Sequence, residues 1–151
     1  MKRLRLMLSL ALMCAIAVTG MPQTAQAARS KRGNEMMRVI NNMRANAGLR
    51  PLRPSDRLVR SSRARSELMM QADFFAHPAE LRVPTFDRVG EVLELHGGRA
   101  PQPRNVLRRW LNSYGHRAVL TGRYRRVGAA RAVGRYNGSR ATIWVVRVGN
   151  K

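Results

Sequence analysis

The chain has 151 residues, with 29 Lys and Arg against 8 Asp and Glu and a single cysteine, Cys14. Three of the basic residues and the cysteine lie in the first 27 residues, so the remainder carries 26 basic and 8 acidic residues and no thiol. This composition excludes disulfides and thiolate metal ligands beyond that segment, and it favours anionic partners such as envelope polymers. It contains no reader motif for nucleic acid and no repeat of basic and aromatic residues, which argues against specific nucleic-acid recognition.

Residues 1–27 are typical of a secretory signal peptide. A basic start precedes an apolar run over residues 6–20, and Ala25-Gln-Ala27 then forms a small-residue cleavage site. The apolar run is shorter than the ~20 residues that span a membrane, so no transmembrane anchor is expected after cleavage. We therefore predict an exported protein, periplasmic or extracellular, with a loose basic tether over residues 28–33 and one folded domain over residues 34–151.

Two helices are predicted next. Asn34 caps the first, which runs to about Ala47 with an apolar stripe along one side. Residues 49–54 contain two prolines and are expected to form an extended connector. Ser55 then caps a second helix that runs to about Asp73.

The middle of the chain is predicted to be largely irregular. Residues 74–78, with two phenylalanines and a proline, form an anchored turn that fixes His77. Residues 84–88 begin with a proline and are expected to form a short helix. A short strand over residues 90–95 follows, and residues 96–103, which are rich in Gly and Pro, are expected to form a loop.

An apolar helix then leads to a histidine. The apolar side of this helix carries Val106, Leu107, Trp110, Leu111 and Tyr114. Gly115 supplies the backbone freedom that a helix terminus commonly needs. We therefore expect the helix to end at Gly115 and to hold His116 at its accessible end, with a helical turn over residues 117–120 after it.

The last part of the chain predicts a hairpin. Residues 126–134 and 140–148 have the composition of strands, and Tyr136-Asn-Gly-Ser139 between them favours a type I′ turn. Four successive apolar residues, 143–146, indicate that the second strand is covered on both faces. Helices combined with a small antiparallel sheet predict the α/β (α+β) class and a layered sandwich.

Three polar residues on separate segments, His77, Glu91 and His116, are the candidates for chemistry. They could form a His-Glu-His ligand set with an open position for water, or act as acid, base and orienting group around a polar ligand. They could also be unrelated side chains, and spacing alone favours this third interpretation. Ser113 lies one helical turn before His116 and would allow a Ser-His-Glu arrangement, but no Gly-x-Ser-x-Gly motif supports it.

The order of several short motifs resembles a known family. The motifs are Asn41-Asn-Met-Arg44, Ala47-Gly-Leu49, Phe75-Ala-His77, Gly90-Glu91, Trp110-Leu-Asn-Ser113, Gly115-His116-Arg117, Val127-Gly128 and Ile143-Trp-Val-Val146. This series, from about Asn34 to Gly149, resembles the bacterial, cysteine-free branch of the CAP superfamily, whose members carry an SCP domain. The superfamily groups cysteine-rich secretory proteins, antigen 5 and plant pathogenesis-related proteins.

The resemblance implies secretion, a three-layer α-β-α sandwich, and a central cleft where two histidines and two acidic residues meet. It places His77, Glu91 and His116 in that cleft, which in some members holds a divalent metal such as zinc. This chain departs from the pattern twice. Val92 stands where an asparagine usually follows the Gly-Glu pair, and Ser113 stands where many eukaryotic members carry the second glutamate. With one carboxylate left, tight Zn²⁺ binding is disfavoured.

We therefore expect a secreted protein whose cleft, formed by His77, Glu91, His116 and Ser113, binds a polar or anionic ligand in the cell envelope or outside the cell, with little or no catalysis. One alternative is a metal-assisted hydrolase in which His77 and His116 hold Zn²⁺ while Glu91 ligates or activates water. Another is charge-driven binding of anionic envelope polymers, in which the cleft has no part.

Overall fold

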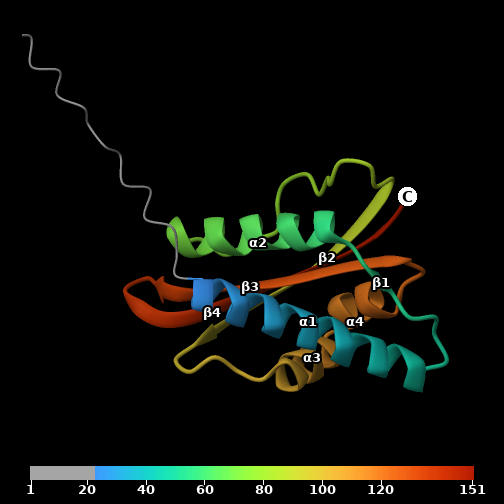
Figure 1. Cartoon of the computed structure of the whole chain (residues 1–151), viewed down its shortest axis with the longest axis horizontal. Helices are drawn as coiled ribbons and strands as arrows, with labels where there is room; N and C mark the ends of the chain where they lie inside the picture. The colour runs from blue at the N-terminus through green and yellow to red at the C-terminus, as the bar shows by residue number, and fades with distance from the viewer. Residues whose placement is uncertain (1–22) are drawn as a thin grey trace, which may run out of the picture.

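A four-stranded sheet lies between two layers of helices (Figure 1). The computed structural model describes residues 23–151, so most of the predicted signal peptide lies outside the described residues. The elements in chain order are α1 (Gln23–Asn46), β1 (Arg53–Pro54), α2 (Asp56–Gln71), β2 (Arg88–Gly97), α3 (Pro103–Asn112), α4 (Tyr114–Thr121), β3 (Arg126–Tyr136) and β4 (Ser139–Asn150). Their order in the sheet is β1-β3-β4-β2.

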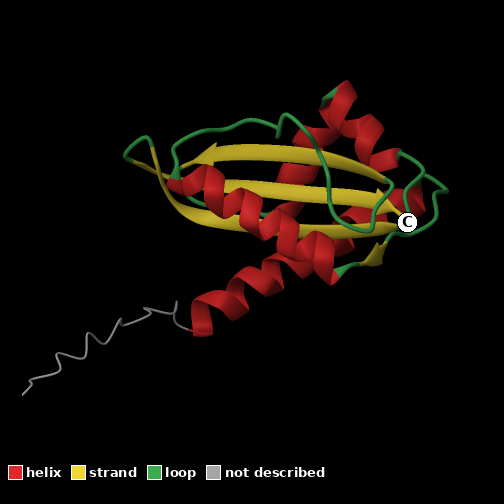
Figure 2. Cartoon of the chain, turned by 90° about the horizontal axis from the view of Figure 1, so that it is seen from above, coloured by secondary structure: helices red, strands yellow, loops and turns green. Residues whose placement is uncertain are grey.

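The layers confirm the α-β-α sandwich. Helix α2 covers one face of the sheet, while α1, α3 and α4 cover the other (Figure 1). Figure 2 shows α2 from above, lying across the strands. The sheet is mixed, because the short β1 runs parallel to β3 whereas β2, β4 and β3 are antiparallel neighbours.

Strand β4 is buried on both faces, as its apolar run predicts. Ile143 and Val145 pack with Met69 of α2, whereas Trp144 packs with Met36 of α1 on the other face. Successive side chains of a strand point to opposite faces, so one strand serves both layers. Because burial of such a side chain contributes roughly 1.5–3 kcal/mol, β4 is the main hydrophobic link between the layers.

Two local predictions are confirmed. The β3–β4 hairpin turns at Asn137 and Gly138, whose φ angles of 47° and 76° lie in the left-handed region that a type I′ turn requires. Ser55 caps α2, and its side chain accepts a hydrogen bond from the backbone N–H of Leu58. Both signals depend on only a few neighbouring residues.

Helix α1 is longer than the sequence predicts. It begins at Gln23, so residues 28–33 are helical and the prediction of a tether there is wrong. Gly33 lets α1 approach β3 closely, since a Cβ atom on Gly33 would lie 2.6 Å from the carbonyl oxygen of Ala129. The cap predicted at Asn34 therefore lies inside the helix, because tertiary packing overrides local preference.

Two predictions between α2 and α3 are also wrong. Residues 84–88 form no helix, because Thr85 has a φ of 71° and the chain enters β2 at Arg88. The loop predicted over residues 96–103 is shorter, because β2 continues to Gly97. Strand β2 pairs with β4 along its whole length, from Arg88 to Gly97, and this long-range pairing fixes where the loop begins.

The third predicted helix is in fact two helices. Helix α3 stops at Asn112, and Ser113 has an extended backbone with φ −101° and ψ 124°. Helix α4 then starts at Tyr114, and the carbonyl of Ser113 accepts from the N–H of Arg117. Gly115 therefore lies in the first turn of α4 instead of ending a helix, and Tyr114 is 81% exposed instead of facing the core.

Arg44, near the end of α1, is buried and ties α1 to α4. Its guanidinium donates to the carbonyl oxygens of Arg50, Leu120 and Gly122 at 2.9, 2.7 and 3.1 Å. Burial lowers the pKa of Arg44, and the three carbonyls satisfy its donors. These contacts fix the carboxyl end of α4, the helix that carries His116.

Candidate functional site

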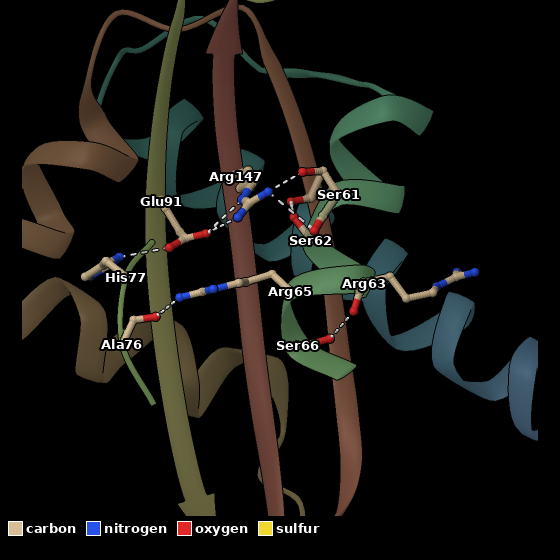
Figure 3. Close-up of polar contacts among 10 residues, drawn as sticks. Ser61, Ser62, Arg63, Arg65, Ser66, Ala76, His77, Glu91 and Arg147 are labelled. Carbon is tan, nitrogen blue, oxygen red and sulfur yellow. Dashed lines mark hydrogen bonds and ion pairs between the residues drawn. The ribbon is translucent and has the colours of Figure 1, made fainter. Parts of the chain in front are cut away.

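Glu91, on β2, is the buried centre of a polar cluster (Figure 3). Its side chain is only 1% exposed. Oε1 lies 2.9 Å from Nδ1 of His77, and Oε2 accepts a hydrogen bond from Nε of Arg147 at 2.7 Å. Both carboxylate oxygens are therefore engaged, as burial of a charged group requires.

Arg147 enters this cluster from the neighbouring strand. Glu91 and Arg147 are register partners on β2 and β4, so their side chains stand on the same face of the sheet, toward α2. Nη2 of Arg147 also lies 2.7 Å from Oε2 of Glu91, and Nη1 donates to the hydroxyl of Ser61 on α2. Arg147 was not among the predicted site residues, although a charged residue within the apolar sequence of β4 indicates a buried partner.

The loop after α2 holds His77 in position. Arg65 of α2 donates to the carbonyl of Ala76 (Figure 3). Its guanidinium also lies over the ring of Phe74, 5.1 Å from the centroid. Two contacts from one helix thus fix the residues that precede His77. The histidine is anchored at its backbone even though its side chain is 56% exposed.

The contact with Glu91 also orients the ring of His77. A carboxylate only accepts hydrogen bonds, so Nδ1 carries a proton and, in the neutral ring, Nε2 is the acceptor. Because the carboxylate is buried and the ring is more than half exposed, the outer part of the ring is open to a ligand. A carboxylate behind a histidine is the usual arrangement of an orienting group and a base.

His116 reaches β2 from the other face of the sheet. It lies in the first turn of α4, which packs over the face that carries Gly90. A Cβ atom on Gly90 would lie 3.0 Å from a methyl carbon of Val119, so the missing side chain makes room for α4. Glu94 points to this same face and pairs with Arg109 of α3 at 2.5 Å.

The surroundings of His116 lower the pKa of its ring. Burial lowers this pKa below its usual value of 6.5, the positive charge of His77 lowers it further, and the negative charge of Glu94 opposes the shift. His77 and His116 therefore interact electrostatically although they come from different layers. Glu91 contacts His77 directly and is not among the charges that shift His116.

Ser113 stands apart from this cluster. Its backbone joins α3 to α4, and its side chain caps neither helix. A Ser-His-Glu arrangement of Ser113, His116 and Glu91 would need Glu91 to orient His116. In the part of the chain that the structure describes, Glu91 bonds to His77 and Arg147 instead.

The predicted zinc ligands do not fit a metal as they stand. Within residues 23–151, no group of three His, Cys, Asp or Glu side chains is placed to hold a metal ion. Arg147 already neutralises Glu91, which is the carboxylate of the predicted set. A metal at Oε2 would have to displace Arg147, and a metal at Oε1 would have to displace Nδ1 of His77.

We expect the two histidines to report on each other in an NMR titration. His116 should titrate below 6.5. His77→Gln should raise the pKa of His116, because it removes a positive charge nearby, whereas Glu94→Gln should lower it, because it removes a negative one. The third histidine provides the control, and His96→Gln should leave the pKa of His116 unchanged.

The lowered pKa of His116 makes the free energy of unfolding depend on pH. Since the folded-state pKa of His116 lies below 6.5, the unfolded chain binds more protons as the pH falls below 6.5, and the free energy of unfolding decreases there. The decrease should be smaller in His116→Gln, measured by urea unfolding at several pH values. An unchanged pKa of His116 in His77→Gln would show that the two rings do not interact.

The sandwich and the Gly-Glu and Gly-His motifs agree with a family comparison. Residues 37–148 match the family described as CAP: Cysteine-rich secretory protein family, and the chain belongs to this family. The comparison with curated proteins finds no match. Within residues 23–151, no helix combines the length and the apolar character needed to cross a bilayer.

Solved structures with this fold include three bacterial proteins. An extracellular protein with an SCP domain from Bacillus anthracis is 20% identical, with a TM-score of 0.64 over 86% of this chain and 44% of that one. An outer surface protein from Borrelia burgdorferi is 18% identical, with a TM-score of 0.61 over 87% and 96%. A cysteine-rich secretory protein from Staphylococcus aureus is 17% identical, with a TM-score of 0.59 over 82% and 40%. This chain therefore spans less than half of two of these proteins, and the likeness shows the fold alone.

Proposed function

We propose that this CAP-family protein is secreted and binds a polar or anionic ligand, in the cell envelope or outside the cell, through His77 and His116. The observation that carries the proposal is the contact between the buried carboxylate of Glu91 and the exposed ring of His77. Glu91 fixes the ring orientation, so His77 can meet a ligand without loss of side-chain freedom. His116 adds a second ring whose charge responds to that of His77.

The charge balance favours an anionic ligand. Arg147 neutralises Glu91, so the buried carboxylate adds no net negative charge beneath His77. No acidic residue follows Glu94 in the sequence, and the chain after residue 27 has 26 basic residues against 8 acidic ones. A cationic surface raises the local concentration of anions. Because Nδ1 of His77 donates to Glu91, the ring supplies a directional donor to an anion at Nε2 when that nitrogen also carries a proton.

Binding accounts for the site better than metal-assisted hydrolysis. The hydrolase alternative needs Glu91 as a metal ligand or as the base that activates water. Both oxygens of Glu91 are already engaged, and the ion pair with Arg147 is buried. His77 remains the accessible group, and it is suited to binding.

Binding of anionic probes tests the proposal. Inorganic phosphate, glucuronate and long-chain polyphosphate would be titrated into the purified protein at low and high salt, with NMR as the readout. We expect at least one small anion to shift His77 and His116 together. His77→Ala and His116→Ala should each weaken this binding about tenfold, or about 1.4 kcal/mol, whereas His96→Ala should not.

Other outcomes would support the alternatives. Polyphosphate binding that collapses with salt and ignores both His77→Ala and His116→Ala, with no small anion bound, would overturn the proposal in favour of charge-driven binding. Stoichiometric zinc in protein purified without chelators, lost in His77→Ala, would favour the hydrolase instead.

A further inference from the structure

A groove lies between α1 and α2, at the edge of the sheet opposite to β2. Strand β1 pairs with β3 only at Arg126 and Val127. The N–H of Ser55 then donates to the carbonyl of Val127, and α2 begins at the next residue, Asp56. Within residues 23–151, no strand pairs with this side of β3 beyond Val127. The groove lies along that part of β3 and has a volume of about 280 Å³.

Two glycines hold the walls of the groove in place. A Cβ atom on Gly33 of α1 would lie 2.6 Å from the carbonyl oxygen of Ala129, and one on Gly128 would lie 2.2 Å from backbone atoms of α2. Both helices are therefore packed closely against β3, on either side of the strand (Figure 1). Ala129 and Ala130 of β3 form part of the floor between them. The shape of the groove follows from backbone packing.

One stripe of each helix lines the groove. The two stripes consist of Ser30, Asn34 and Met37 on α1 and of Asp56, Val59 and Arg63 on α2. On α2, an acidic residue stands at one end of the stripe, a basic residue at the other and an apolar residue between them. Residues seven positions apart in a helix are separated by about 10.5 Å along its axis. The groove therefore carries opposite charges at its two ends and an apolar wall in the middle.

The charged residues at the two ends have no partner of opposite charge within residues 23–151. Arg63 extends from α2 toward α1, and its Nη2 lies 3.4 Å from Oγ of Ser30 (Figure 3). The ion pairs of the described residues include neither Arg63 nor Asp56. Arg131 also lines the groove, but its guanidinium lies over the ring of Trp144, 5.5 Å from the centroid. Arg63 is therefore the cation that can meet a ligand.

Water fits the middle of the groove poorly. A bound water molecule needs about two to four polar partners, whereas Met37 and Val59 face the groove there with apolar side chains. Asn34, on the wall formed by α1, can exchange hydrogen bonds with an amide group. A matching ligand combines an ammonium for Asp56, a carboxylate for Arg63 and an apolar group with an amide between them.

We propose that this groove binds a dipeptide with free ends, whose ammonium contacts Asp56 and whose carboxylate contacts Arg63. An apolar side chain of the dipeptide packs against Met37 and Val59. Two extended residues span about 7 Å, and a charge-assisted hydrogen bond of about 2.8 Å at each end covers the remaining distance along α2. Longer peptides do not fit, because the volume lies below the roughly 300–1,000 Å³ of pockets for drug-sized ligands. The groove is at the opposite edge of the sheet from Glu91, and the proposal does not depend on the function proposed for the histidines.

Blocked ligands test the two ends separately. Alanyl-leucine is titrated into the full protein with NMR as the readout, beside N-acetyl-alanyl-leucine, which lacks the ammonium, and alanyl-leucinamide, which lacks the carboxylate. We expect each blocked form to bind about fivefold more weakly than alanyl-leucine, which is the upper contribution of an exposed ion pair. This part of the test uses the unaltered protein, so it does not depend on whether a variant folds.

Variants then assign each end of the ligand to a residue. Asp56→Asn should abolish the preference for a free ammonium and keep the preference for a free carboxylate, whereas Arg63→Gln should do the reverse. The matched controls Asp87→Asn and Arg60→Gln change exposed residues outside the groove and should keep both preferences. Each preference is a ratio of two dissociation constants for the same variant, so a general change in stability does not affect it.

Equal affinity of the unaltered protein for alanyl-leucine and both blocked forms would overturn the proposal, and so would no binding at millimolar concentration. Leucine that binds as tightly as alanyl-leucine would overturn the assignment to two residues. A carboxylate preference that survives Arg63→Gln would place the ligand elsewhere. His77→Ala should leave binding of alanyl-leucine unchanged, so failure of this proposal is distinguishable from failure of the histidine site.

Discussion

Replacing Arg147 by methionine is expected to lower the free energy of unfolding by about 3–5 kcal/mol, because the variant leaves the Glu91 carboxylate buried without its cation. The side chain of Glu91 is 1% exposed and that of Arg147 is 8% exposed, so water cannot replace the lost partner. The remaining contact of Glu91 is a single hydrogen bond to His77. Urea unfolding at neutral pH measures the loss.

A double variant separates the burial of charge from the loss of packing. Arg147→Met combined with Glu91→Leu removes both charges together, and we expect it to recover most of the stability lost in Arg147→Met. Glu91→Leu alone should be intermediate, because Arg147 keeps its contact with Ser61 on α2. A loss below about 1 kcal/mol in Arg147→Met would show an exposed pair, since exposed ion pairs contribute only that much.

The pair also explains which parts of the site the sequence could predict. Glu91 and His77 are 14 residues apart, and each stands in a short motif that can be recognised. Arg147 is 56 residues from Glu91 and is one of 29 basic residues, so no local pattern identifies it as the partner. The register of β2 against β4 brings them together, and register follows from the whole sheet.

For the fold as well, the features that follow from local sequence were predicted, and those that follow from long-range contacts were not. The turn at Asn137 and Gly138 and the cap at Ser55 follow from a few neighbouring residues, and both were predicted. The break between α3 and α4 at Ser113 was not predicted, because Gly115 is a stronger local signal for the end of a helix than Ser113. The position of α4 depends on the space above Gly90 and on the bonds from Arg44, which lies 76 residues before Leu120.

These distant contacts decide how the predicted site residues are arranged. His77 and Glu91 meet on the α2 side of the sheet, while His116 comes from the layer on the other side. Nothing in the sequence distinguishes His77, Glu91 and His116 from one another, so all three were predicted to lie in one cleft. Successive side chains of β2 point to alternate faces of the sheet, so Glu91 and Glu94 lie on opposite faces. Glu91 therefore orients His77, while the negative charge of Glu94 raises the pKa of His116.

Gly128→Ala is expected to destabilise the protein by about 3 kcal/mol or more, as overpacking against backbone allows little relaxation. A Cβ atom on Gly128 would lie 2.2 Å from the carbonyl carbon of Leu58 and 2.2 Å from the nitrogen of Val59. Both atoms belong to the backbone of α2, so no side chain can rotate away. Helix α2 must then move off β3, and the hydrogen bond from Ser62 to the Gly128 carbonyl is lost.

Gly115→Ala is the matched control for this prediction. Gly115 lies in the first turn of α4, and a Cβ atom there would meet nothing within 4 Å. Because alanine favours a helix over glycine, Gly115→Ala should be neutral or stabilising by up to about 1 kcal/mol. Urea unfolding of the two variants under the same conditions compares them directly. A destabilised Gly115→Ala would favour the helix end that the sequence predicted at this position.

The displacement of α2 in Gly128→Ala should also reach the histidine site. Helix α2 supplies Ser61 to Arg147 and supplies Arg65 to the loop that holds His77. If α2 moves, His77 loses its anchor, and its ring resonances should broaden or shift while those of His116 on α4 change less. Equal changes at both histidines would instead indicate general loosening of the sheet. Close packing at Gly128 of β3 is therefore expected to determine the position of His77, which contacts the outer strand β2.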